Sequence, residues 1–305
     1  MRNPDIAGPN LLIRHSSFRT KGAKHMSHSI TLLDGAMGTS LWEKTADKLP
    51  VWRYNMLSPD LVKQVHEDMI ASGAEVILSN TFGANGPEVV RRTQYTVEQA
   101  VREGMAIAKD AAKGKARVLL DMGPLTGLLE PYGDIEEDEC EEIYLEMLQA
   151  GVKEQPDGIF LETFIDLNML SVAARCAARF DLPLYLSMSF EKVGKTMMGN
   201  SVRDMVEELS ALHPAAVGLN CSMGPDLCLP VLKSFREYTD LPLIFKPNAG
   251  LPVMVNGKAV SPYTPDMFRQ DMVPALSVAS FVGGCCGTTC EHISALREAV
   301  REMQP

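Results

Sequence analysis

Two adjacent cysteines near the end of the chain carry the clearest chemical signal. The stretch FVGGCCGTTCEH places Cys285 and Cys286 between a pair of glycines and a Gly-Thr-Thr run. Neighbouring cysteines rarely form a disulfide with each other, because the bond would distort the peptide between them. The flanking glycines allow the backbone to turn both sulfur atoms to one side. The pair is therefore either two ligands of a metal ion or two buried thiols of the core.

A third cysteine follows an apolar run in a similar setting. Cys221 comes directly after Asn220 in the stretch VGLNCSMGP. Three soft thiolates with no obvious fourth protein ligand are typical of zinc with an open coordination position, as in catalytic sites. The alternatives are small buried side chains, as we expect for Cys176 and Cys228, or a structural or redox-sensing site without catalysis. Whether Cys290 approaches the metal stays open.

Such a zinc site favours one kind of chemistry. An ion that carries three thiolates has a net charge of about −1, so it polarises carbonyl groups weakly but holds an electron-rich ligand well. A substrate thiol in the open position would be deprotonated and still nucleophilic, which indicates alkylation of that sulfur. Zinc hydrolases more often use histidine and carboxylate ligands, and none of the six histidines follows an expected strand.

The elements that position these residues alternate regularly along the chain. Eight apolar runs rich in branched residues predict buried strands at 30–33, 75–78, 117–120, 158–161, 184–187, 216–219, 243–245 and 277–282. Helical spacing between them predicts helices that include 60–72, 141–151, 202–212 and 225–238. This alternation predicts a single-domain (β/α)8 TIM barrel over residues 29–305. An open doubly wound sheet is the alternative, but its Gly-rich fingerprint is missing after the first strand.

In such a barrel the carboxyl ends of the strands meet at one mouth, where the active site is built. The candidate residues that follow strands are Asp34, Gly35, Ala36, Met37, Glu162, Asn220, Cys221, Cys285 and Cys286. Asp34 and Glu162 could bind an ammonium group, and the amides of residues 35–37 could bind a carboxylate. Together they describe an amino acid whose side chain reaches zinc. A general acid and base pair is the competing use of the two carboxyls, and Asp34 alone could simply form a turn.

Composition narrows the class of partner. Hydrophobic residues make up 46% of the chain and charged residues 22%, which is typical of a soluble globular protein. The net charge of −10 argues against nucleic acid or an anionic membrane as a partner, because both require basic patches. No apolar run approaches the roughly 20 residues that span a bilayer. A small molecule or another protein is the expected partner.

The first 28 residues differ from the rest. They are basic and polar, and their one apolar cluster is too short for the central segment of a secretory signal. We expect residues 1–28 to be a disordered leader or an over-extended start upstream of Met26, with a targeting segment as the alternative. Without a secretory signal, the seven cysteines are expected in the reducing cytoplasm.

Seven stretches of the chain match one enzyme family. They read LLDGAMGTSL, SNTFGAN, GPLTGLLEPYGD, IFLETF, VGLNCSMGP, KPNAGLP and GGCCGTTCEHI. Together they resemble the homocysteine S-methyltransferase family from Thr31 to the last helix. The resemblance implies a zinc-dependent barrel that converts L-homocysteine to L-methionine. By motif position it implies Cys221, Cys285 and Cys286 as zinc ligands.

The same resemblance implies how the substrate is bound. It places Asp34 and Glu162 at the amino group of homocysteine and the loop of Gly35, Ala36 and Met37 at its carboxylate. We also count Asn220, beside the first zinc ligand, among the substrate-binding residues.

The methyl donor is a finer question. The stretches most resemble the homocysteine-binding module of cobalamin-dependent methionine synthase. Enzymes of the family that use S-methylmethionine tend to have arginine where this chain has Gly287, and betaine-using enzymes have a tyrosine in the loop that here reads TFGAN. Because no folate- or cobalamin-binding module is present, we expect methylcobalamin carried by a separate corrinoid protein. A small sulfonium such as S-methylmethionine is the alternative donor.

Overall fold

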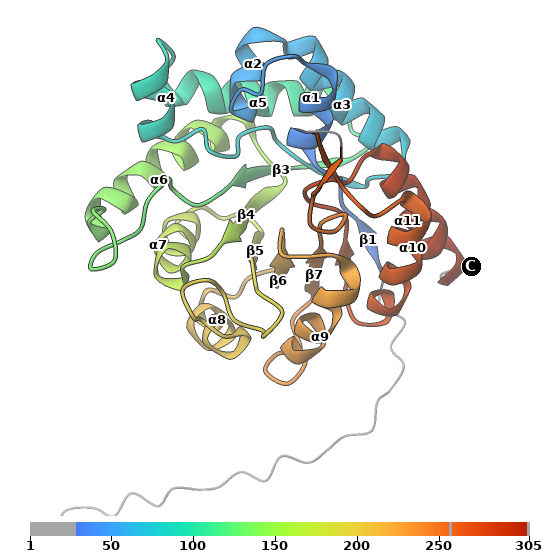
Figure 1. Ribbon diagram of the computed structural model, residues 1–305. Helices are drawn as coiled ribbons and strands as arrows, with labels where there is room; N and C mark the ends of the chain where they lie inside the picture. The colour runs from blue at the N-terminus through green and yellow to red at the C-terminus, as the bar shows by residue number, and fades with distance from the viewer. Residues whose placement is uncertain (1–28, 256–257, 304–305) are drawn as a thin grey trace, which may run out of the picture.

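The computed structural model describes residues 29–255 and 258–303, and the segment 1–28 that we expect to be a leader lies outside them. Eight parallel strands form a ring surrounded by helices (Figure 1). The strands are β1 Thr31–Leu32, β2 Val76–Leu78, β3 Arg117–Met122, β4 Gly158–Phe164, β5 Leu184–Met188, β6 Ala216–Asn220, β7 Leu243–Lys246 and β10 Phe281–Val282. A parallel bridge between Leu33 and Val76 closes the ring between β1 and β2. The prediction of a (β/α)8 barrel is confirmed.

The helices cover the outside of this ring. They are α1 Met37–Lys44, α2 Tyr54–Leu57, α3 Pro59–Ala71, α4 Gly86–Arg92, α5 Val97–Ala112, α6 Glu137–Gly151, α7 Leu167–Ala177, α8 Val202–Leu209, α9 Pro225–Phe235, α10 Pro265–Met272 and α11 Cys290–Met303. Local signals set several starts: Thr96 and Ser201 form capping boxes at α5 and α8. Within the part of the chain that the structure describes, every helix is too short or too polar to cross a bilayer.

Several predicted boundaries were wrong. The run at 277–282 gives only the two-residue strand β10, because its first residue, Ser277, ends the 3-10 helix 273–277 and residues 278–280 lie outside any strand. Helix α6 begins at Glu137 rather than at 141, since three acidic residues in its first turn favour a helix N-terminus. Helix α8 ends at Leu209 and continues as the 3-10 helix Ser210–Leu212. The antiparallel hairpin of β8 Val253–Val255 and β9 Lys258–Val260 was not predicted.

The apolar core has two layers that the strands separate. The larger one lies between the strands and the helices, and the smaller one is drawn from inward-facing strand residues such as Leu119, Phe160 and Ile244. Because alternate residues of a strand share a face, the next inward positions after these three are Asp121, Glu162 and Lys246. A polar layer therefore lies on top of the apolar filling of the barrel, at the carboxyl ends of the strands.

One core residue makes stability depend on pH. His66 of α3 is fully buried, and neither of its ring nitrogens has a hydrogen-bond partner. Burial lowers its pKa to about 3. The unfolded imidazole takes up a proton near pH 6.5. The buried imidazole of the folded state stays neutral at that pH. Protonation therefore favours the unfolded state, and the free energy of unfolding falls as the pH drops below about 6.5.

We predict that His66→Leu flattens this pH dependence. One pH unit corresponds to about 1.4 kcal/mol for one proton, so the variant should gain about 2 kcal/mol relative to the parent between pH 8 and pH 5. Urea titrations at both pH values measure the difference. His213→Asn, at an exposed histidine, serves as the control. An equal stability change in the parent and in His66→Leu would contradict the prediction.

Candidate active site and metal centre

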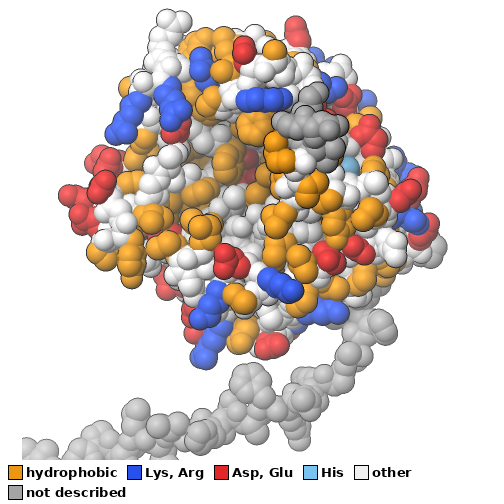
Figure 2. All heavy atoms as spheres, viewed as in Figure 1, with side chains coloured by type: hydrophobic (Ala, Val, Ile, Leu, Met, Phe, Trp, Pro, Cys, Tyr) orange, Lys and Arg blue, Asp and Glu red, His pale blue; other side chains and the backbone are white. Residues whose placement is uncertain are grey.

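A cavity of about 320 Å³ lies at the mouth formed by the carboxyl ends of the strands. Figure 2 shows hydrophobic side chains gathered around this hollow. Eight of the nine candidate residues line the cavity, and the exception is Asn220. The other residues that line it include Leu78, Asn80, Asp121, Thr163 and Lys246. The expected convergence of residues from distant parts of the chain is thus present.

The three candidate thiols lie together on one side of the cavity. The Sγ atoms of Cys221, Cys285 and Cys286 are all within 4.8 Å of one another, and those of Cys221 and Cys286 are 3.5 Å apart. Tetrahedral zinc with bonds of about 2.3 Å separates its sulfur ligands by about 3.8 Å, so this donor set fits zinc. No fourth histidine, cysteine or acidic side chain joins the group among residues 29–255 and 258–303, and Cys290 is not part of it.

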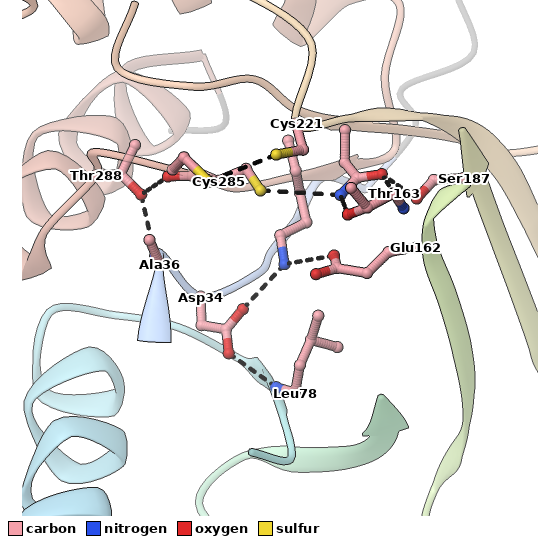
Figure 3. A network of polar contacts seen from close by, with 12 residues as sticks. Asp34, Ala36, Leu78, Glu162, Thr163, Ser187, Cys221, Cys285 and Thr288 are labelled. Carbon is pink, nitrogen blue, oxygen red and sulfur yellow. Dashed lines mark hydrogen bonds and ion pairs between the residues drawn. The ribbon is translucent and has the colours of Figure 1, made fainter. Parts of the chain in front are cut away.

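The backbone brings these sulfur atoms together. Cys221 has a φ of 47°, in the left-handed region, directly after β6. The amide of Cys285 donates to the carbonyl of Pro247 at 2.8 Å. Thr288 Oγ1 accepts from the amide of Ala36 at 3.1 Å and donates to the carbonyl of Cys285 at 2.8 Å. This hydroxyl therefore fastens the cysteine loop to the loop after β1 (Figure 3).

The thiols share their protons unequally. Contacts with the thiols of Cys221 and Cys285 lower the pKa of Cys286 to about 3. The contacts with Cys285 and Cys286 raise the pKa of Cys221. The lowered pKa favours the thiolate form of Cys286, and a thiolate is a ligand that soft cations prefer.

The side chain of Asn220 connects the thiols to the neighbouring strands. It is fully buried, and its Oδ1 accepts from the amide of Thr163 and from Ser187 Oγ, both at 2.8 Å. Its Nδ2 donates to Thr163 Oγ1 at 2.7 Å and lies 3.8 Å from the Sγ of Cys285. Thr163 has a φ of 68°, which is unfavourable for a β-branched residue. Asn220 therefore holds the left-handed position Thr163, and its backbone leads directly into the second left-handed position, Cys221.

A second polar cluster lies below the thiols in Figure 3. The Nζ of Lys246, at the end of β7, is 3.3 Å from Asp34 Oδ1 and 3.5 Å from Glu162 Oε2. Asp34 Oδ2 also accepts from the amide of Leu78 at 2.8 Å. The three charged side chains are at most 11% exposed. An ammonium group does lie between the two predicted carboxyls, but it belongs to the protein.

The charges of this cluster are poorly balanced. Three buried carboxyls, those of Asp34, Asp121 and Glu162, surround the one ammonium of Lys246. Burial raises the pKa of all three, that of Glu162 to about 7. Burial opposes the charge on Lys246, but Glu162 and Asp34 outweigh it and raise its pKa. Lys246 is therefore a permanent cation of the site.

The comparisons with known proteins agree with this site. A family model described as homocysteine S-methyltransferase matches residues 31–300. The chain belongs to the homocysteine S-methyltransferase family. Methionine synthases of Mycobacterium tuberculosis and Mycobacterium leprae are 29% and 28% identical over 92% and 90% of the chain, which spans about a quarter of their length. The metallated form of the Escherichia coli homocysteine methyltransferase MmuM shares the fold, with a TM-score of 0.74 and 21% identity, over 89% of this chain and 96% of that one.

The loop that family resemblance assigns to the substrate's carboxylate lies where it was expected. Gly35, Ala36 and Met37 all line the cavity, and Met37 begins α1. The amide of Ala36 already donates to Thr288, whereas those of Gly35 and Met37 have no hydrogen-bond partner among the described residues. The first turn of a helix leaves such amides free for an anion.

Sequence reasoning missed Asp121 and Lys246. Both end apolar runs, in the stretches VLLDMGP and LIFKPN, and both lie two positions after an inward-facing apolar residue. A charged residue at the carboxyl end of a barrel strand was the available signal.

We predict that Asn220→Ala lowers the free energy of unfolding by about 3 kcal/mol, because it leaves the Thr163 amide and the Ser187 hydroxyl buried without their partner. Urea denaturation measures the change. Asn168→Ala, at an exposed position of α7, is the matched control and should change stability by less than about 0.5 kcal/mol. Similar losses in the two variants would show that Asn220 holds nothing in place.

Proposed function

We propose that the protein methylates the sulfur of L-homocysteine to give L-methionine, with Zn²⁺ bound by Cys221, Cys285 and Cys286. The observation that carries this proposal is the group of three sulfur atoms in the cavity that also contains the buried carboxyls. When bound, zinc would keep the substrate's sulfur deprotonated and nucleophilic at neutral pH.

The remaining residues would bind and orient the amino acid. Glu162 supplies an oxygen for its ammonium group, and Asp34, whose oxygens contact Leu78 and Lys246, adds negative charge nearby. The free amides at Gly35 and Met37 supply donors for its carboxylate. Asn220 keeps the thiol ligands in place rather than touching the substrate, because its amide is engaged with Thr163 and Ser187. The side chain of the substrate then extends from the carboxyls toward the thiols.

The transfer step needs no proton transfer from the protein. The homocysteine thiolate attacks the methyl carbon in line, the new S–C bond forms as the bond from the methyl group to the donor breaks, and the donor leaves with the electron pair. Protein side chains contribute orientation and the exclusion of water. The competing use of Asp34 as a general base is disfavoured, because Leu78 and Lys246 occupy both of its oxygens.

We propose methylcobalamin on a corrinoid protein as the methyl donor. The resemblance of the chain to the homocysteine-binding module of cobalamin-dependent methionine synthase supports this choice, and two relatives are named methionine synthase. A small sulfonium such as S-methylmethionine is the alternative. Assays with each donor alone distinguish methylcobalamin from the sulfonium, because only methylcobalamin requires a corrinoid.

We place the enzyme in the cytoplasm, where thiols such as its free cysteines stay reduced.

Zinc-edge X-ray absorption tests the central proposal. We predict three sulfurs and one lighter atom around zinc in the loaded protein, and four sulfurs after addition of L-homocysteine, because the substrate's thiol takes the open position. Cys285→Ser should lose zinc and methyl transfer while keeping its far-UV spectrum. The control Cys290→Ala should retain both. Four sulfurs before homocysteine is added would instead indicate a closed, structural site.

We further predict that Glu162→Gln separates substrate binding from metal binding. Loss of a charge-assisted hydrogen bond should weaken L-homocysteine binding by about 10- to 100-fold, measured by calorimetry on the zinc-loaded protein. The zinc content should not change, because Glu162 is not among the thiol ligands. An unchanged homocysteine affinity would remove Glu162 from the proposed role.

A further inference from the structure

The place that a substrate ammonium was expected to take is already filled. Lys246 Nζ lies between Asp34 and Glu162, and the second oxygen of Asp34 accepts from the amide of Leu78. Asp34 thus has a partner for each oxygen. Glu162 uses one oxygen for Lys246, and its other oxygen has no hydrogen-bond partner among the described residues. An incoming ammonium needs another acceptor beside that free oxygen.

Asp121 at the end of β3 offers one. Its side chain is buried, lines the cavity, and leaves Oδ1 without a hydrogen-bond partner. Two hydrogen bonds fix its backbone. The amide of Asp121 donates to Ser79 Oγ at 3.0 Å, and its carbonyl accepts from Thr81 Oγ1 at 2.6 Å. With the backbone fixed, the side chain cannot easily move to find a partner. A buried carboxyl oxygen without a hydrogen bond destabilises the folded protein unless a ligand pairs with it.

Building on the proposed function, we infer that Asp121 is a substrate-binding residue that receives the ammonium of the acceptor together with the free oxygen of Glu162. Lys246 is the positioning residue of this arrangement. It fills the gap between Asp34 and Glu162 and so directs the ammonium of the substrate toward Asp121.

The charges give the site its specificity. One cation faces three buried carboxyls in the protein alone, and an α-ammonium would supply a second. A thiol acid of the same length without the amino group would leave Asp121 unpaired and add a further negative charge. The site therefore selects thiols that carry an ammonium group over thiol acids that lack one.

Calorimetry on the zinc-loaded full chain tests this assignment with two ligands, L-homocysteine and 4-mercaptobutanoate, which lacks only the amino group. The parent should bind homocysteine at least about tenfold more tightly. Asp121→Asn should reduce this preference to within about threefold without loss of zinc. Asp181→Asn, at an exposed carboxyl before β5, is the matched control and should keep the preference of the parent.

Lys246→Met provides the second arm. Removing the lysine opens the gap between Asp34 and Glu162 to the ammonium of the substrate. The preference for homocysteine over 4-mercaptobutanoate should therefore persist in Lys246→Met, and adding Asp121→Asn to that variant should not lower it. If Lys246→Met does not fold, Lys246→Gln replaces it. Retention of the full preference in Asp121→Asn, or equal binding of the two ligands by the parent, overturns the inference. Failure of homocysteine to add a sulfur to zinc would instead overturn the proposed function, which X-ray absorption reports separately.

Discussion

The ion pairs of Lys246 with Asp34 and Glu162 are the constraint on which the mouth of the barrel depends. They join the ends of β1, β4 and β7 at a level where the barrel changes from apolar filling to polar side chains. Each charge is buried, so each requires the others: removing one partner of such a group typically costs about 3–5 kcal/mol, because the remaining charge stays buried and unpaired. The cluster therefore fixes the floor of the cavity before any substrate arrives.

The thiol cluster depends on a different kind of constraint, which is backbone geometry. Cys221 and Thr163 both adopt left-handed conformations that their surroundings must maintain. The buried side-chain amide of Asn220 binds Thr163, and the backbone amide of Cys221 donates to the carbonyl of Lys246 at 3.2 Å. On the other side, Thr288 joins the cysteine loop to the loop after β1. These contacts join chain segments that are far apart in sequence beside the three thiols. The protein itself thus sets the sulfur positions, in an arrangement that fits a metal ion.

Much of this arrangement could be predicted from the sequence, because the signals were local. Apolar runs of three to six residues and alternating helical segments indicated the barrel, and the rule that strand ends meet at one mouth brought Cys221, Asp34 and Glu162 together. What could not be predicted depends on which face of a strand each residue occupies. Lys246 ends an apolar run, and its direction toward the cavity follows only once Ile244, two positions earlier, is known to face into the barrel. The strand at 277–282 is shorter than predicted, because only Phe281 and Val282 pair with the neighbouring strands and Ser277 ends a 3-10 helix.

The division of the cavity into a sulfur side and a carboxyl side bears on the class of reaction. A general acid or base must have a free oxygen near the reacting atom and a protonation state that can change during the reaction. Asp34 has both oxygens engaged, and Glu162, which keeps one free oxygen and a raised pKa, is not part of the thiol group. The thiols, in contrast, form the one cluster in the cavity whose donors suit a soft metal ion. The proposed reaction forms and breaks bonds at sulfur and carbon and moves no proton in that step. In it the carboxyl side would orient the substrate, and the sulfur side would prepare the nucleophile.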